Sequence, residues 1–328
     1  MSERRAVNVA EFSGDVAGFV PFPDGFRVTE ISAQPENALE RLVTRPKLSR
    51  FRAAWQAIRA ARGGPIVSHL PRTTLAVAFA QRALHSRSRH LAFAFNFTAL
   101  PSGRFAGAAW KALDAVDRFV VFSQFEKRLY AEQLGIPAEK LKFLLWAQEP
   151  PTVATDPAPF SKGSYISSVG GEGRDYETLL AAARLLPDVQ FVLVTRPYNS
   201  AADLPPNVLH FTNLPGDKTW RIVADSMATV VPLLTTETCC GHITIVGSEL
   251  LGVPVISTHS AATTDYTDDV ALCAPGDPAA LAALIASHVT EKDALMAAAQ
   301  ARLPAKIARH DRAAWRREIA SFVLGTPD

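Results

Sequence analysis

Short apolar runs alternate with amphipathic segments along most of the chain, and each kind of segment predicts a different element. Before residue 150, the runs that read as buried strands are 26–31, 65–69, 91–97 and 118–122. Apolar residues three and four positions apart predict helices at 50–61, at 73–84 and from 124 to about 134. Ser123 and Glu126 form a capping box at the start of the last of these helices.

The second half of the chain shows the same alternation more clearly. Its predicted strands are 164–169, 190–194, 208–211, 228–231 and 253–258. Its predicted helices are 176–186, 218–226 and 244–251, one that begins at Asp277-Pro278, and a last one at about 311–323. Strands that alternate with helices at this spacing predict parallel sheets that are buried on both faces.

A proline-rich segment divides the chain. Four prolines lie within residues 150–159, which show no helical pattern and predict a stiff linker. We expect an N-terminal domain over 1–149, a linker over 150–162, a C-terminal domain over 163–310 and a final segment over 311–328. The predicted fold class is α/β, with two Rossmann-like, doubly wound parallel sheets that face a cleft. Ligands of such sheets bind at the carboxyl ends of the strands.

Composition is typical of a folded cytoplasmic protein. The chain has 328 residues, 48% of them hydrophobic and 20% charged. No apolar run reaches the roughly 18–20 residues of a membrane span, and the N-terminus does not read as a signal peptide. The three cysteines, Cys239, Cys240 and Cys273, suit a reducing compartment and provide neither a disulfide framework nor a zinc motif, so we interpret them as packing residues.

The net charge of +2 conceals opposite charges in the two halves of the chain. Residues 1–150 carry 21 basic and 13 acidic side chains, whereas residues 151–328 carry 13 and 19. Between Arg41 and Lys111 there are 13 basic residues and no acidic one. Such a stretch is usually solvated surface, but the lack of acids favours an anionic partner. Nucleic acid is not the expected partner, because the chain shows no aromatic stacking motif or known nucleic-acid module.

A glycine-rich turn follows the strand predicted at 164–169. Residues 170–174 read Gly-Gly-Glu-Gly-Arg, in which the glycines allow close backbone approach and Arg174 can bind phosphate oxygens. Asp175 is suited to cap the helix that follows. The spacing matches neither the dinucleotide fingerprint nor a P-loop, so a plain turn with a surface arginine stays open as the alternative.

A second polar loop, residues 232–244, leads from a predicted strand into a helix. The free amides of Gly241, His242 and Ile243 would face whatever binds there. His242 could donate to a phosphate or a sugar hydroxyl, although a structural role is more common for a single histidine.

This second loop, followed by Gly-Val-Pro-Val-Ile at 252–256, resembles the donor-site segment of family-4-like glycosyltransferases of the GT-B fold. Further segments resemble the same family in order and spacing: 117–123 with 134–137, 168–180, 208–215 and 274–278. The resemblance covers about residues 65–325. It implies a nucleotide-diphosphate sugar on the C-terminal domain, an acceptor on the N-terminal domain, and transfer without a cofactor or a required metal. It also implies that the helix in 311–328 crosses back to the N-terminal domain.

By position, the resemblance also implies which residues form the site. Gly170, Gly171 and Arg174 would face the diphosphate, and Asn213 and Leu214 would flank the base. The other donor-binding residues implied are Thr195, Thr236, Glu237, Cys240, Gly241, His242, Ile243 and Thr244. The residues implied in catalysis are His69, Asn96 and Arg174, and no metal ligand is expected.

The sequence departs from the family pattern at the usual pair of glutamates. These align with Cys239 and Gly247, and the second normally holds the ribose. Glu249 lies about 200° further round the helix than Gly247, so it does not simply replace it. The usual catalytic-region histidine aligns near Asn96, and the glycine-rich first loop of the N-terminal domain is not visible. An inverting reaction would need a base, for which His69 is the candidate, whereas a retaining one would not.

The leading hypothesis is a sugar transferase with a glycan or lipid-linked acceptor, in surface polysaccharide synthesis. A non-catalytic nucleotide-sugar-binding partner subunit is an alternative that the missing glutamates favour. A nucleotide-sugar 2-epimerase is a further alternative, which the few histidines and carboxylates between residues 65 and 100 disfavour. The basic stretch predicts binding to an anionic membrane at the inner face through Arg45, Lys47, Arg50 and Arg52, with a solvated helix face as the alternative.

Overall fold

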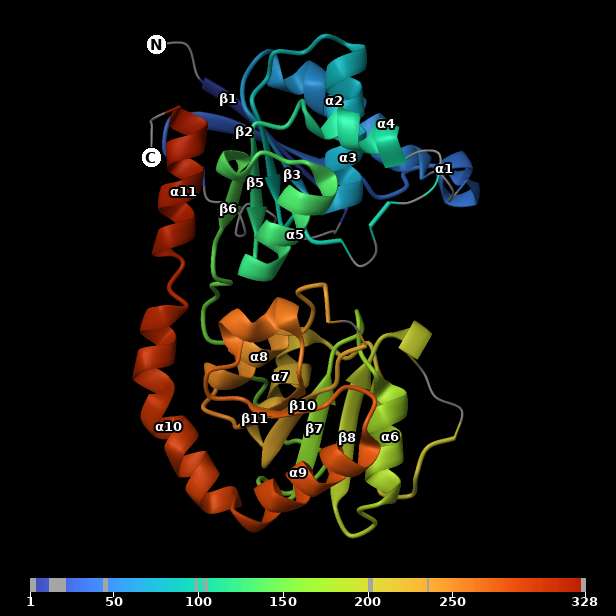
Figure 1. Ribbon diagram of the computed structural model, residues 1–328, viewed down its shortest axis with the longest axis vertical. Coiled ribbons are helices and arrows are strands. Elements are labelled where there is room, and N and C mark those ends of the chain that lie inside the picture. Colours follow the sequence, from blue (N-terminus) through green and yellow to red (C-terminus); the bar gives the residue numbers. More distant parts are fainter. Residues whose placement is uncertain are drawn as a thin grey trace. The chain divides into compact units, whose positions relative to one another are not determined.

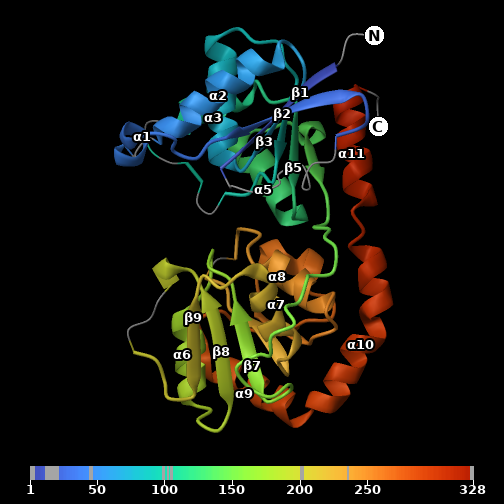
Figure 2. The ribbon, with the colours of Figure 1, turned by 180° about the vertical axis from the view of Figure 1, so that it is seen from behind.

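The computed structural model describes residues 4–11, 22–43, 47–97, 100–101, 103, 106–199, 203–234 and 236–325. The chain divides into two compact units (Figure 1). Unit 1 comprises Met1–Leu144 and Ala313–Asp328, and unit 2 comprises Leu145–Arg312. Each unit contains a six-stranded parallel sheet. Helices flank each sheet, as Figure 2 also shows from behind. The predicted α/β class with two Rossmann-like sheets is therefore confirmed.

In unit 1 the strand order is β2-β1-β3-β4-β5-β6, and all neighbouring strands run parallel. The order reverses at β1 and β3, and such a switch point is where doubly wound sheets bind their ligands. The strands are β1 (Arg4–Ala10), β2 (Phe26–Ser32), β3 (Ile66–His69), β4 (His90–Phe93), β5 (Arg118–Val121) and β6 (Leu141–Phe143). The helices before residue 145 are α1 (Ala38–Leu42), α2 (Leu48–Ala61), α3 (Pro71–Ala83), α4 (Ala106–Leu113), α5 (Gln124–Leu134) and the 3-10 turn Ala138–Lys140.

Strand β1 is missing from the sequence-based prediction. It pairs with β2 on one side and β3 on the other, and Ala6 to Ala10 are buried. The apolar run is short and is interrupted by Asn8, which hid it from the pattern. The first loop of this domain would follow β1, so the expectation that the glycine-rich loop is absent stays untested. The segment that follows carries Gly14 and Gly18 and lies outside the described residues.

In unit 2 the strand order is β12-β11-β10-β7-β8-β9, again all parallel. The switch point lies between β7 and β10. The strands are β7 (Tyr165–Val169), β8 (Gln190–Thr195), β9 (Val208–Thr212), β10 (Ala228–Val231), β11 (Val255–Thr258) and β12 (Ala271–Cys273). The helices are α6 (Tyr176–Arg184), α7 (Gly216–Ala224), α8 (His242–Glu249), α9 (Pro278–Thr290) and α10 (Lys292–Arg309), with 3-10 turns at Pro197–Asn199 and Ala261–Tyr266.

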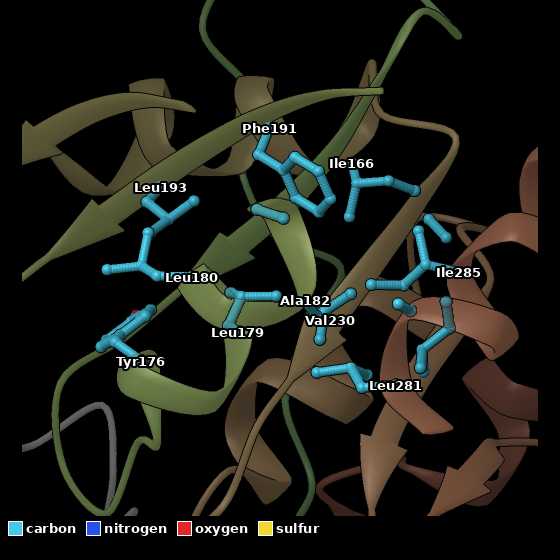
Figure 3. Packing of buried hydrophobic residues seen from close by; sticks show 14 of the residues in the cluster. Ile166, Tyr176, Leu179, Leu180, Ala182, Phe191, Leu193, Val230, Leu281 and Ile285 are labelled. Carbon is cyan, nitrogen blue, oxygen red and sulfur yellow. The ribbon is translucent and has the colours of Figure 1, made fainter. Parts of the chain in front are cut away.

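Both faces of the unit 2 sheet are buried, which explains its nearly continuous apolar strands. Along β8, Phe191 and Leu193 pack on one face with residues of α6 and α9 (Figure 3). Val192 packs on the other face with Ile222 and Val223 of α7.

The predicted caps are also present, because each of three side chains accepts a hydrogen bond from a helix amide. Ser123 caps α5, Asp175 caps α6 and Asp277 caps α9.

The last helix, α11 (Ala313–Leu324), belongs to unit 1, whereas α10 belongs to unit 2. The Trp315 ring stacks on Phe122, with centroids 5.5 Å apart, and meets Phe93 edge-on at 5.3 Å. Glu318 forms an ion pair with Arg118 at 2.7 Å. The final segment of the chain therefore completes the core of unit 1.

We predict that Trp315→Ala lowers the free energy of unfolding by about 3–5 kcal/mol, the range for truncating a buried tryptophan. Urea unfolding followed by circular dichroism measures the change. Leu324→Ala is the matched control, because Leu324 is exposed on the same helix and its truncation should cost less than about 0.5 kcal/mol. Equal effects of the two substitutions would contradict an anchoring role for Trp315.

Candidate functional site

The two loops singled out in the sequence meet at the switch point of unit 2. The glycine turn follows β7 and the polar loop follows β10, and these strands are neighbours. An isolated backbone bridge joins Arg174 to Leu233, and the Leu234 amide donates to the Gly173 carbonyl at 2.9 Å. The two loops therefore form one site at the carboxyl edge of the sheet.

Arg174 is a buried cation within this site, since only 6% of the residue is exposed. Its Nη1 donates to the Glu172 carbonyl at 3.0 Å, and its Nη2 donates to Thr244 Oγ1 at 3.0 Å. Within the described part of the chain, Nε has no hydrogen-bond partner and no carboxylate forms an ion pair with the guanidinium. Burial lowers the pKa of Arg174. A buried cation without a counter-ion favours the binding of an anion.

Two glycines allow the backbone to pass close to Arg174. Gly170 has a φ of +120°, and a Cβ there would lie 2.7 Å from Arg174 Nη2. Gly241 has a φ of +85°, and a Cβ there would lie 2.8 Å from Val231 Cγ1. Positive φ and lack of space both exclude larger residues. Helix α8 begins directly after Gly241, so its first free amides add to the anion-binding character of the site.

Sequence reasoning missed two side chains beside the glycine turn. Arg196 follows β8, and Tyr198 lies in the 3-10 turn after it. A Cβ on Gly171 would overlap the Arg196 side chain and lie 2.8 Å from Tyr198 Oη. The signal was available, because both residues directly follow the carboxyl end of a predicted strand, where only Thr195 was assigned.

The predicted base-binding residues, Asn213 and Leu214, directly follow the end of β9. The backbone amide of Asn213 donates to the Thr195 carbonyl at 3.0 Å, and its side-chain Oδ1 accepts from Arg196 Nη1 at 3.1 Å. Leu214 packs against the core of unit 2. Arg196 thus contacts both the predicted base-binding segment and the glycine turn.

His242 is a neutral, packed histidine in this structure. Its ring centroid lies 5.3 Å from that of Trp146 and 5.5 Å from that of Tyr266. Burial lowers its pKa to about 3, so it adds no positive charge near neutral pH. Among the described residues of the same loop, those that are exposed are Leu234, Thr236, Glu237 and Ile243.

The position of Trp220 explains why one of the two family glutamates, the one that aligns with Gly247, is absent. A Cβ on Gly247 of α8 would overlap the six-membered ring of Trp220 on α7. A glutamate at position 247 is therefore excluded while the indole occupies this space. Cys239, which aligns with the other missing glutamate, is buried, and so is its neighbour Cys240.

Glu249 has partners of its own and does not stand in for the missing residue. Its carboxylate accepts from Lys306 Nζ at 2.6 Å and lies 3.8 Å from His310 Nε2. Lys306 also forms an ion pair with Asp269 at 2.9 Å. These ion pairs connect α8 to α10 and give Glu249 a structural role.

In unit 1, His69 ends β3 at the switch point of the sheet. Its Nε2 lies 2.7 Å from Asn8 Oδ1, and the Asn8 amide nitrogen donates to Glu30 Oε2 at 3.0 Å. Because the Asn8 oxygen only accepts, the hydrogen of the neutral imidazole is on Nε2. Burial lowers the pKa of His69 to about 3, so it is neutral at physiological pH and a weak base.

Glu11 directly follows β1 at the same switch point and was not predicted. Its carboxylate pairs with Arg50, whose Nη2 donates to Oε2 at 3.1 Å, and with Lys47 at 3.5 Å. Thr73 Oγ1 donates to Oε1 at 3.4 Å. Although partial burial opposes ionisation, the hydrogen bond and charge of Arg50 lower the pKa of Glu11. Because β1 was not predicted, Glu11 was not recognised as a residue at the carboxyl end of a strand.

Asn96 lies in the segment after β4, where its backbone amide donates to the Ala94 carbonyl at 3.0 Å. The predicted catalytic residues therefore belong to different units: His69 and Asn96 to unit 1, and Arg174 to unit 2.

The basic stretch between Arg41 and Lys111 carries less unneutralised charge than its sequence suggested. Lys47 and Arg50 pair with Glu11, and Arg52 pairs with Glu36 and Glu40 at 2.8 Å each. Acids from outside the interval thus neutralise three of the four cations predicted to bind a membrane. The fourth, Arg45, lies outside the described residues. No helix in the described part of the chain is long and apolar enough to cross a bilayer.

We predict that Trp220 and Gly247 are energetically coupled. Gly247→Ala should destabilise unit 2 by about 1–3 kcal/mol through overpacking, and Trp220→Leu should cost about 2–4 kcal/mol by leaving a cavity. The double variant should cost at least about 1 kcal/mol less than the sum, because the added methyl enters the space that the indole leaves.

Denaturant unfolding of all four proteins measures this coupling. Gly216→Ala is the control, because a Cβ on Gly216 meets nothing within 4 Å. Additive effects of the two substitutions would show that the ring does not exclude a side chain at position 247.

No protein-family model matches the chain, and no curated protein sequence matches it significantly. Solved structures match it along its whole length. HepE of Anabaena in complex with UDP-glucose has a TM-score of 0.72 at 14% identity, covering 98% of this chain and 99% of that one. A UDP-forming α,α-trehalose-phosphate synthase of Burkholderia vietnamiensis has a TM-score of 0.70 at 13% identity, covering 98% and 100%.

The lipopolysaccharide outer core galactosyltransferase WaaB, in its apo form, has a TM-score of 0.62 at 12% identity, covering 98% of this chain and 100% of that one. At these identities the likeness concerns the fold. The chain has the two-domain GT-B fold of these glycosyltransferases, as the sequence resemblance predicted.

Proposed function

We propose that this protein is a glycosyltransferase that moves a sugar from a nucleotide-diphosphate sugar to a glycan or lipid-linked acceptor. The observation that carries the proposal is the buried guanidinium of Arg174 at the switch point of unit 2, which forms no ion pair with a carboxylate of the described residues. Two glycines and the start of α8 surround it, so the site suits a strongly anionic group such as a diphosphate. UDP-glucose and UDP are bound by HepE, which shares the fold.

The chemistry requires stabilisation of the negative charge that develops on the diphosphate as the sugar leaves. Arg174 supplies a fixed cation, and the first amides of α8 supply hydrogen-bond donors. Arg196 adds a second cation beside the turn. These groups would act without a metal ion, so we propose a metal-independent transferase with no cofactor.

The acceptor, in this proposal, binds to unit 1 at the carboxyl ends of β1 and β3. Glu11 presents an ionised carboxylate there, and His69 is oriented by Asn8. Because burial lowers its pKa to about 3, His69 is a weak base. In this proposal it therefore orients the site and does not remove the proton of the acceptor. We propose surface polysaccharide synthesis in the cytoplasm, at the inner membrane face, as the setting of the reaction.

A second candidate function is a non-catalytic subunit that binds nucleotide sugars. The observation in its favour is the Trp220 ring, which excludes a carboxylate at position 247. The two functions share the donor site and differ in whether acceptor-dependent turnover occurs.

We predict that Arg174→Gln weakens binding of the nucleotide-sugar donor about 10- to 100-fold, the effect of losing a hydrogen bond from a charged group. A thermal-shift panel of nucleotide sugars first identifies the donor, and calorimetry in the presence of EDTA then measures its affinity. Arg184→Gln is the control, because Arg184 lies on α6 in an exposed ion pair with Asp203. Equal donor affinity in wild type and Arg174→Gln would remove the diphosphate from this site.

We predict that Glu11→Gln lowers acceptor-dependent turnover at least about tenfold and leaves the dissociation constant of the donor unchanged. The substitution removes the carboxylate that orders Arg50 and Lys47 at the proposed acceptor edge. Glu36→Gln is the matched control, since Glu36 pairs with Arg52 at the surface. Donor binding without turnover by wild type, across glycan and lipid-linked acceptors, would support the subunit function instead.

A further inference from the structure

Helices α1 and α2 expose four large apolar side chains. Leu39 and Leu42 of α1 are 61% and 81% exposed, and Phe51 and Trp55 of α2 are 48% and 47% exposed. Arg52 of α2 donates to Glu40 of α1 at 2.8 Å, so the two helices are held together at this end of unit 1. We call these four residues the apolar patch.

The two aromatic residues of the patch, Phe51 and Trp55, lie on the outer face of α2. Phe51, Trp55 and Arg59 follow one another at spacings of four, so they share one side of the helix, and Arg62 directly follows its last residue. The opposite side packs into the core of unit 1 through Ala53, Ala54 and Ala57. The exposed aromatic side chains are therefore not required for the packing of the helix.

The side of α2 that carries the aromatic rings is also basic. The Arg59 guanidinium lies 5.6 Å above the Trp55 ring, and Arg59 and Arg62 are exposed. Residues 38–62 contain seven basic side chains and one acidic side chain, Glu40, which is buried against Arg52. Among the described residues of this segment, Lys47, Arg50 and Arg52 pair with acids, whereas Arg59 and Arg62 are exposed and Arg59 lies over the Trp55 ring.

We propose that the apolar patch, flanked by Arg59 and Arg62, docks onto the surface of an anionic lipid membrane. The aromatic side chains of α2 and the leucines of α1, together with the arginines that follow Trp55, match the headgroup boundary, where apolar groups insert and cations meet lipid phosphates. Charge complementarity selects this partner, because a neutral or basic protein surface would leave the arginines without counter-ions.

Docking at this face would serve the proposed acceptor edge. The inner side of the same helix carries Lys47 and Arg50, which contact Glu11 at the end of β1. A lipid-linked acceptor that enters from the membrane would therefore reach the carboxyl edge of the unit 1 sheet along α2. This last step rests on the proposed function, whereas membrane docking itself does not.

Vesicle sedimentation tests the proposal with the full chain and no substrate. The probes are vesicles of phosphatidylcholine with about 30% phosphatidylglycerol and vesicles of pure phosphatidylcholine. Wild type should pellet with the anionic vesicles and release as salt rises. Phe51→Gln/Trp55→Gln should lower the partition coefficient about tenfold or more, because two large apolar groups no longer insert. Arg59→Gln/Arg62→Gln should lose the preference for anionic vesicles.

Leu185→Gln/Ile307→Gln is the matched control, because both residues are exposed apolar side chains of unit 2. It should bind vesicles like wild type, and thermal melts should show that all variants are folded. Wild type that stays in the supernatant with both vesicle types would overturn the proposal. Equal pelleting of Phe51→Gln/Trp55→Gln and wild type would also overturn it. So would a wild type that forms a dimer and does not bind vesicles, if Phe51→Gln/Trp55→Gln is a monomer. Donor calorimetry on the same samples tests the proposed function separately.

Discussion

The burial of the Arg174 guanidinium, with no counter-ion among the residues that the structure describes, is the constraint on which the unit 2 site depends. Desolvation makes a buried cation costly, and a neutral hydroxyl and backbone carbonyls compensate only part of that cost. Arg174 has such partners in Thr244 and Glu172. The surrounding choices follow from it, because Gly170 makes room for its guanidinium and Gly241 places the start of α8 beside it. A diphosphate would complete the charge balance that the chain leaves open.

The sequence predicted those parts of the fold that depend on local chemistry. Strands buried on both faces read as apolar runs, and the caps Ser123, Asp175 and Asp277 marked three helix starts. Strand β1 escaped because Asn8 interrupts it, and Asn8 is present to bind His69 and Glu30. The residue that hid the strand is thus one that links three strands at the candidate acceptor edge.

Contacts between elements account for what the sequence could not show of the site. Arg196 reaches Gly171 and Asn213 only because β7, β8 and β9 are neighbours, and nothing in its local pattern distinguishes it. The same holds for the basic stretch. An interval without acids along the chain is not without acids in space, since Glu11 and Glu36 come from outside it. Charge counted along a sequence therefore overestimates the free charge of a surface.

The exchange of a carboxylate for an indole changes how a nucleotide can be held. A glutamate at position 247 would accept hydrogen bonds from ribose hydroxyls in the family that the chain resembles, whereas the Trp220 ring accepts none in its place. In the proposed function, binding energy would then come from the diphosphate, through Arg174 and α8, and from the base, near Asn213 and Arg196. A donor held at its two ends and not at its ribose is still oriented, because two separated anchor points fix its direction. In the proposed transferase, the arrangement would therefore preserve the positioning that sugar transfer requires, while the affinity for the donor would depend more strongly on charge and on salt.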